Sequence, residues 1–162
     1  MANAPRETTS VLIVFLDLSR FKFEAARRED AEIAAALNAF YRLVAREAAA
    51  GGGRVVKFIG DAALVVFPES AIDAAARTLR HLRRSVDEFF IELGWGCRFS
   101  ARAHFGPVVA GEFGPPGDER FDIIGRAVNK TAMIQANGVT LSHAAWRRLS
   151  PEGRSRFQLR PK

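Results

Sequence analysis

Two aspartates stand where carboxylates often bind a divalent metal ion. Asp17 ends the apolar run 11–17 (VLIVFLD), and Asp61 follows Gly60 between the apolar runs 54–59 and 62–67. If the first run lies beside the hairpin formed by the other two, the carboxylates meet at one end of a sheet. Mg²⁺ takes oxygen ligands of this kind and leaves coordination positions for phosphates. Taken alone, an Asp after a strand or in a Gly-Asp turn is more often ordinary turn chemistry.

The elements that must position these acids follow from the apolar patterns. Length and β-branched content predict strands, helical spacing predicts helices, and glycine clusters end them. Gly60-Asp61 and Gly106-Pro107 each predict a hairpin turn, and Ser70 is a candidate N-cap. The predicted strands are 11–17, 54–59, 62–67, 97–104, 107–113, 121–124, a short strand after Asn137-Gly138 and a final strand near 156–160, and the predicted helices are 24–50, 70–93, roughly 127–136 and one near 143–149.

This order contains a βαββαβ unit, which predicts an α+β fold with a ferredoxin-like core. We expect a mostly antiparallel sheet covered by helices. The 162 residues suit one domain, with a flexible N-terminus over 1–10 and the folded domain over 11–162.

The amino-acid composition limits the protein class and the cellular compartment that we expect. The chain has 48% hydrophobic and 26% charged residues, an ordinary globular balance. No apolar run reaches the roughly 18 to 20 residues that span a bilayer, and residues 1–10 do not resemble a signal peptide. The single cysteine, Cys97, excludes an intrachain disulfide and a zinc cluster. We therefore expect a cytoplasmic protein with no membrane span.

The net charge of +6 invites a polyanionic partner. The densest basic patch contains Arg77, Arg80, His81, Arg83 and Arg84, and helical spacing places most of it on one helix face. A solvated helix face is the more ordinary interpretation, since no nucleic-acid-binding signature accompanies it. We expect no nucleic-acid partner.

Four motifs in order resemble the catalytic domain of class III adenylyl and guanylyl cyclases. FLDLSRF (15–21) resembles the first metal motif, and GGGRVVKFIGDAALVVF (51–67) resembles the second. HFGPVVAGEFG (104–114) resembles the hairpin before the dimerisation arm, and RFDIIGRAVNKTAMIQANG (120–138) resembles the substrate-binding strand and helix. The resemblance covers residues 11 to about 142 and implies the nucleotide cyclase fold, whose core is also ferredoxin-like.

The resemblance also implies roles for single residues. Asp17, Asp61 and the backbone carbonyl of Leu18 would hold two Mg²⁺ or Mn²⁺ ions per active site. Phe21 belongs to the loop that wraps the triphosphate, and Asn129 would orient the ribose. In the family the metals come from one subunit and Asn129 from the other, which implies a homodimer with shared active sites.

The base selectors would be Lys57 and Asp122. Lysine only donates hydrogen bonds and an ionised aspartate only accepts them. Adenine offers an acceptor at N1 and a donor amine at N6, whereas guanine offers the reverse pattern. This polarity favours ATP over GTP, and it leaves CTP open because cytosine presents the same edge as adenine. The expected activity is adenylate cyclase, a phosphorus-oxygen lyase that makes 3′,5′-cyclic AMP and pyrophosphate.

Two departures from the family pattern bear on activity. Met133 stands one helical turn after Asn129, where the family usually carries an arginine that stabilises charge on the transferring phosphate. Arg20 and Lys22 lie in the phosphate loop, and Arg20 is the candidate substitute. We therefore expect low activity. The alternatives are a weakened cyclase-homology module that binds or regulates, and a cyclase for another nucleotide such as CTP.

Overall fold

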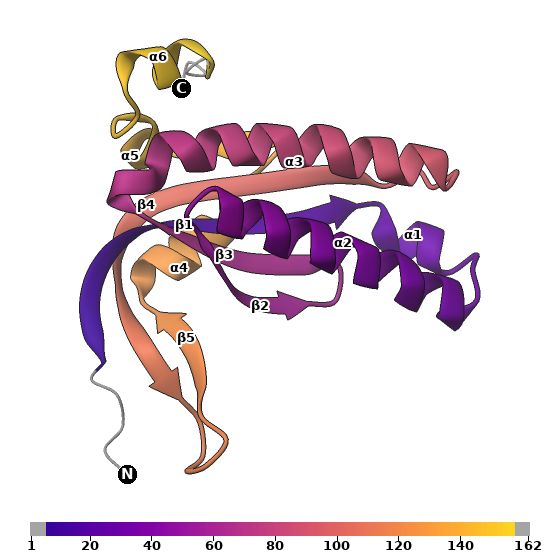
Figure 1. Cartoon of the computed structure of the whole chain (residues 1–162), viewed down its shortest axis with the longest axis horizontal. Coiled ribbons are helices and arrows are strands. Elements are labelled where there is room, and N and C mark those ends of the chain that lie inside the picture. Colours follow the sequence, from indigo (N-terminus) through magenta and orange to yellow (C-terminus); the bar gives the residue numbers. More distant parts are fainter. Residues whose placement is uncertain (1–5, 158–162) are drawn as a thin grey trace.

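The computed structural model describes residues 6–157, and Figure 1 shows the arrangement of their elements. Those elements are β1 (Glu7–Ser19), α1 (Phe21–Ala25), α2 (Asp30–Ala50), β2 (Arg54–Ile59), β3 (Ala62–Pro68), the 3₁₀ turn η1 (Glu69–Ala71), α3 (Ile72–Glu92), β4 (Arg98–Phe113), β5 (Arg120–Ile124), α4 (Arg126–Ala132), β6 (Val139–Leu141), α5 (His143–Trp146) and α6 (Pro151–Ser155).

The sheet has the order β2-β3-β1-β4-β5, and all of these neighbours pair antiparallel. A short parallel pairing adds β6 to β4. The strands β1, β2, β3 and β4, with α2 and α3 between them, form the predicted βαββαβ unit. The predicted α+β class with a mostly antiparallel sheet is therefore confirmed.

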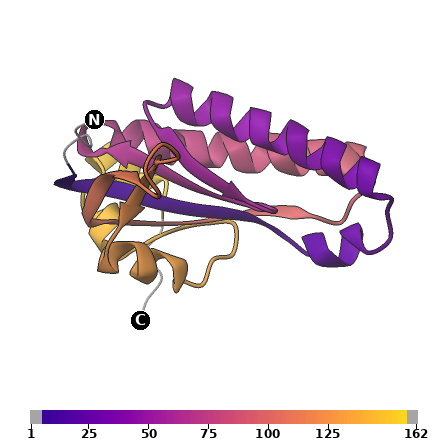
Figure 2. The same ribbon diagram turned by 90° about the horizontal axis from the view of Figure 1, so that it is seen from below.

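Two long helices cover one face of the sheet, as Figure 2 shows. A capping box between Glu29 and Glu32 opens α2, and the helix ends at Gly51. In α3 the buried side chains recur every three or four residues, which turns one stripe towards the sheet. The resulting core includes the fully buried rings of Phe40, Phe67 and Phe90.

On the other face, the helix that covers the sheet within residues 6–157 is α4, which packs against β4 and β1 (Figure 2). Its buried cluster is small and consists of Ile13, Leu64, Val66, Val108, Ile123 and Ala127. Large apolar side chains near it stay exposed, including Ile124 at 52% and Met133 at 84%. Beyond this face β4 and β5 continue as a two-stranded arm (Figure 1).

The predicted hairpin between 97–104 and 107–113 is wrong. Residues 98–113 form the single strand β4, which pairs with β1 from Glu7 opposite Ala110 to Ser19 opposite Arg98. Gly106 lies within this strand, where a Cβ would come within 2.8 Å of the Ala127 side chain. This glycine therefore permits the close approach of α4, and it does not form a turn.

Several predicted boundaries also differ. The predicted helix 24–50 is two helices separated at residues 26–29, and α3 begins at Ile72 after a 3₁₀ turn, without a side-chain cap from Ser70. The predicted helix 127–136 is shorter, because α4 ends at Ala132. β1 begins at Glu7, inside the segment 1–10 predicted to be flexible. α6 was not predicted, residues 156–157 form no strand, and the rest of the predicted final strand lies outside the described residues.

Within residues 6–157, no helix combines the length and the apolar character needed to cross a membrane.

Candidate active site

Asp17 and Asp61 come together at one end of the sheet, as the sequence predicts. Asp17 pairs with Ala62 in the β1–β3 ladder, and Asp61 is the residue just before Ala62 in the two-residue turn between β2 and β3. Burial raises the pKa of the Asp17 carboxyl, Arg102 opposes that rise, and the nearby Asp61 charge adds to it. Two neighbouring carboxylates that repel each other favour a bound cation between them.

Arg102 forms an ion pair with Asp17. Its Nη2 donates to Asp17 Oδ2 at 2.6 Å, and its Nη1 donates to the carbonyl of Ile134 at 3.4 Å. Arg102 lies on β4 opposite Phe15. The guanidinium therefore links Asp17 of β1 to the segment that follows α4.

The loop after Asp17 has an uncommon backbone. Arg20 has a φ of 63°, and it is the one residue other than glycine with positive φ among the described residues. Its guanidinium lies 5.5 Å from the Phe23 ring centroid. Left-handed backbone at a residue other than glycine is a local cost that tends to occur at functional loops.

The side chains beside Arg20 face the core. Leu18 is 3% exposed, and Phe21 is 9% exposed with its ring 6.2 Å from that of Trp95. Only the backbone groups of these two residues are therefore available to a ligand. The predicted role of the Leu18 carbonyl as a metal ligand is one that the backbone would serve, and it stays a prediction.

Lys57 and Asp122, the two predicted base selectors, contact each other directly. Lys57 Nζ donates to Asp122 Oδ2 at 2.6 Å, although the two residues are 65 positions apart in the chain. The Asp122 Oδ1 atom accepts the Ile123 amide at 2.8 Å, which fixes the carboxylate. β2 and β5 thus place one donor and one acceptor side by side, both partly exposed.

Asn129 and Met133 share one side of α4. The Met133 amide donates to the Asn129 carbonyl at 3.2 Å, so the two residues are one helical turn apart. Both side chains are exposed. Among residues 6–157, no hydrogen bond joins Asn129 to the carboxylate pair or to the Lys57–Asp122 pair.

The sequence missed Arg102 and also Tyr41, which supports the Asp61 turn. The Tyr41 hydroxyl donates to the carbonyl of Gly60, and its ring stacks on Phe58 at 4.1 Å between centroids. Burial raises the Tyr41 pKa, with a smaller contribution from the Asp61 charge. The signal for Arg102 was present as alternation in β4, where buried Ala101 and Ala103 flank a polar position. Tyr41 carried no such signal, because it lies among the alanines of α2.

The metal ligands supplied by the protein are few. The described residues contain no group of three or more His, Cys, Asp or Glu side chains that could hold a metal ion. The donor set is two carboxylates and backbone carbonyls, all oxygen. Such a set fits Mg²⁺ or Mn²⁺ when substrate phosphates complete the coordination.

The family model of the adenylate and guanylate cyclase catalytic domain matches residues 4–160. The chain belongs to this family. Uncharacterized proteins of Mycobacterium bovis and Mycobacterium tuberculosis are 31% identical to it over 136 residues. The matched region covers 79% of this chain and 23% of those relatives, so this cyclase domain spans about a quarter of their length.

Solved cyclases share the fold. The adenylyl cyclase CyaB from P. aeruginosa has a TM-score of 0.84 at 19% identity, covering 90% of this chain and 82% of that one. The guanylate cyclase domain of RhGC from Catenaria anguillulae, solved with GTP, has a TM-score of 0.79 at 22% identity, covering 90% and 85%. Adenylyl and guanylyl cyclases both resemble this cyclase domain, so the fold does not select the base.

Proposed function

We propose that this cyclase domain converts ATP to 3′,5′-cyclic AMP and pyrophosphate at sites shared by two copies of the chain. The observation that carries the choice of ATP is the 2.6 Å contact between Lys57 Nζ and Asp122 Oδ2. A donor and an acceptor held side by side match the N1 acceptor and N6 amine of adenine. Guanine would place donor against donor and acceptor against acceptor, a mismatch that costs on the order of 10⁴ in discrimination when buried.

In the reaction, the ribose 3′-oxygen attacks the α-phosphorus and forms the new ester bond. The bond from the α-phosphorus to the bridging oxygen breaks, pyrophosphate leaves, and the 3′-hydroxyl proton passes to solvent. Asp17, Asp61 and the Leu18 carbonyl would hold the two divalent ions, which lower the hydroxyl pKa and neutralise the triphosphate when bound. The chain itself fixes the carboxylates, through Arg102 and the Tyr41-supported turn.

The proposal includes a dimer because a single chain leaves apolar side chains exposed on the sheet face that carries α4. Ile124 and Met133 remain exposed there beside the exposed Asn129. In the proposed assembly, Asn129 of one copy orients the ribose over the carboxylates of the other. Burying this apolar surface would supply part of the association free energy.

Turnover is expected to be low, because no cation occupies the position of Met133. Its thioether cannot stabilise charge on the phosphate, and an arginine in such a role contributes about 10³ to 10⁵ in rate. Arg20 stands in the phosphate loop, and Arg102 already contacts Asp17. Arg20 remains our candidate for the missing charge. The exposed Met133 also supports the second candidate, a module that binds nucleotide without turnover.

The test is product identification. Purified protein is incubated with ATP, GTP, CTP and UTP in direct competition, with Mn²⁺, and cyclic products are separated by mass. The proposal predicts cyclic AMP in excess, and Lys57→Glu should lower that preference. A wild-type preference for GTP would contradict the polarity argument, and cyclic CMP as main product would shift the proposal to a pyrimidine cyclase. Binding of ATP without any cyclic product would favour the second candidate.

A further inference from the structure

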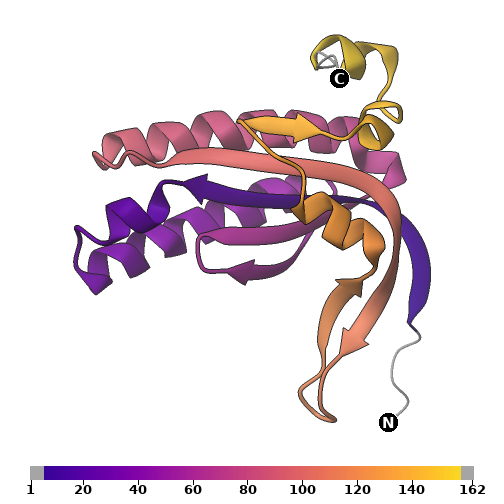
Figure 3. The same ribbon diagram turned by 180° about the vertical axis from the view of Figure 1, so that it is seen from behind.

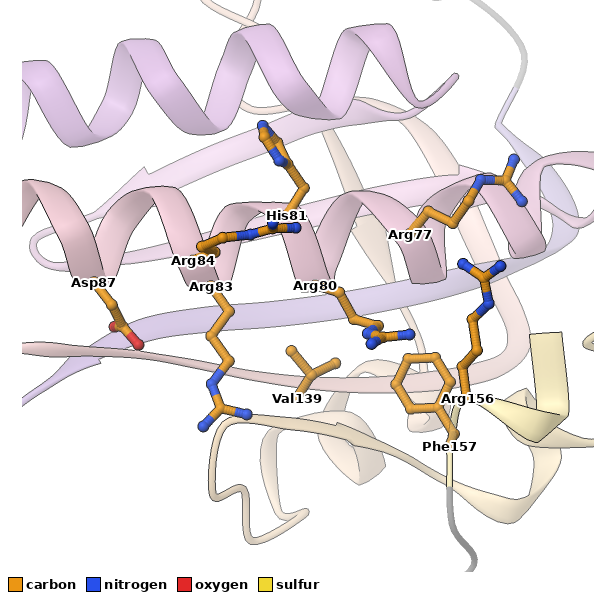
Figure 4. Close-up of a pocket in the computed structure, with 9 residues that line it drawn as sticks. All are labelled: Arg77, Arg80, His81, Arg83, Arg84, Asp87, Val139, Arg156 and Phe157. Atoms are coloured by element: carbon orange, nitrogen blue, oxygen red, sulfur yellow. The ribbon is translucent and has the colours of Figure 1, made fainter.

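A large hollow lined by arginines lies beside α3, and neither Asp17 nor Asp61 is among its lining residues. Its volume is about 910 Å³, and Arg77, Arg80, Arg83 and Arg84 of α3 line it together with Arg156 after α6. Figure 4 shows these side chains, with Val139 and Phe157 on the side of the hollow across from α3. The lining contains five guanidiniums and His81 but one carboxylate, Asp87.

The arginines of α3 lack partners within the described part of the chain. Arg77, Arg80, Arg83 and Arg84 make no hydrogen bond or ion pair with any residue from 6 to 157. Two nearby acids are engaged by other groups, since Asp87 Oδ1 accepts the Phe99 amide at 2.7 Å and Asp73 accepts the Ser150 hydroxyl at 3.0 Å. Of the five lining arginines, Arg156 alone has an acidic partner among residues 6–157, which is Glu152 at 3.0 Å. The four arginines of α3 therefore bring positive charge to the hollow without a paired carboxylate in the described part of the chain.

The hollow continues along the edge of the sheet. A second cavity of about 370 Å³ shares Arg83 and Asp87 and adds Arg98, Ser19 and Gly138. Arg83 lies at the junction, and a Cβ on Gly138 would come within 2.6 Å of its Nη1. Gly138 therefore leaves space for this guanidinium. In Figure 3 the strand β6 that follows Gly138 runs beside β4 and passes in front of α3.

From this geometry we infer a second anion site, which binds a polyphosphate chain between α3 and the segment 138–157. Guanidinium forks match phosphate oxygens bidentately, and several forks that line one hollow from α3 and from Arg156 after α6 suit several linked phosphates. Single-stranded nucleic acid would need a series of stacking aromatic side chains, and here one aromatic residue, Phe157, lines the hollow. The phosphate chain is either inorganic or part of a nucleotide.

The test uses sodium tripolyphosphate as the probe, titrated calorimetrically into the full chain in EDTA at about 0.15 M salt. The chelator removes the divalent ions that the proposed catalytic site requires, so failure here is independent of failure of the proposed cyclase activity. We expect saturable binding of one ion per chain. Arg80→Gln with Arg84→Gln should weaken it at least tenfold. The matched control is Arg42→Gln with Arg147→Gln, which removes the same charge from exposed positions outside the hollow and should change Kd less than twofold.

Four outcomes decide the inference. Selective weakening in the Arg80/Arg84 variant, with an unchanged thermal unfolding midpoint, supports it. Under that result, ATP binding tenfold tighter than tripolyphosphate identifies a nucleotide, and equal binding identifies the phosphate chain alone. Equal weakening in both variants, or no saturation at millimolar probe, overturns the site. A short single-stranded oligonucleotide that binds more tightly than tripolyphosphate, with loss in the Arg80/Arg84 variant, replaces it with a nucleic-acid surface.

Discussion

One face of the sheet is covered by α2 and α3 along much of its length, whereas in the described part of the chain the other face is covered by the short helix α4 (Figure 2). The helix-covered face holds fully buried rings such as Phe40 and Phe90, and the α4 face leaves Ile124 and Met133 exposed. Asp17 and Asp61 project at the end of this sheet, and Asn129 lies on α4. The difference indicates that one face secures the fold, and it supports our proposal that the other face takes part in the active site and binds a second copy.

We expect the largest effect from Asp61, whose substitution should largely abolish activity but leave the stability of the fold nearly unchanged. Asp61→Asn keeps the shape of the turn and removes one metal-binding charge, so cyclase activity should fall on the order of 10³-fold or more. The same variant should unfold at nearly the wild-type denaturant midpoint, because the Asp61 side chain makes no hydrogen bond with the described residues. Undiminished turnover in Asp61→Asn, or in Asp17→Ala, would contradict the two-metal assignment.

On the face covered by α2 and α3, we expect substitutions to lower the stability of the fold. Phe40→Ala leaves a cavity under α2 and should lower the free energy of unfolding by about 3 to 5 kcal/mol. Ile124→Ala on the other face should change it by less than about 0.5 kcal/mol in the monomer, because that side chain is half exposed. Denaturant titration at low protein concentration measures both. Equal costs at the two sites would remove the distinction between the faces.

Restoring an arginine at position 133, directly after α4, is expected to increase activity. Met133→Arg should raise kcat roughly tenfold or more, if it restores one charge-stabilising donor. Arg20→Ala should lower kcat in the wild type and matter less once Met133→Arg is present, since a shared role makes the effects non-additive. Steady-state kinetics of the two single variants and the double variant decide this. Additive effects would reject Arg20 as the substitute.

A smaller effect on metal binding is expected from Tyr41, which lies on α2. Its hydroxyl donates to the carbonyl of Gly60, beside Asp61. Tyr41→Phe should raise the Mn²⁺ concentration for half-maximal activity by up to roughly tenfold, because the turn loses its support. It should also cost about 1 kcal/mol of stability. A stability loss without any change in the metal requirement would make Tyr41 a purely structural residue.

The sequence predicted the features that depend on local pattern and short turns. The runs around Gly60-Asp61 were specific enough to place a hairpin, and the hairpin brought Asp61 to Asp17. The sequence failed at Gly106-Pro107, where turn-forming residues lie inside the 16-residue strand β4. There the close packing of Ala127 on Gly106 decides the backbone, and tertiary contacts of this kind leave no local signal.

In the candidate site too, some residues could be identified from the sequence and others only from the fold. The motifs identified Lys57 and Asp122 as a pair, and the structure brings their side chains into contact. Arg102 and the hollow beside α3 required the fold, because they depend on which strands and helices become neighbours. The helical spacing of Arg77, Arg80 and Arg84 predicted a common face, but it could not show that Arg156 closes a hollow over it.

In the proposed dimer, the carboxylates of one copy and Asn129 of the other make one active site, and subunit complementation tests this arrangement most directly. Asp17→Ala and Asn129→Ala chains are purified with different tags, shown to be inactive alone, mixed, and isolated as a doubly tagged heterodimer. If the site is shared, each heterodimer contains one intact site and should recover about half of the wild-type cyclic AMP production per dimer. Doubly tagged heterodimers that form and remain inactive would contradict a shared site.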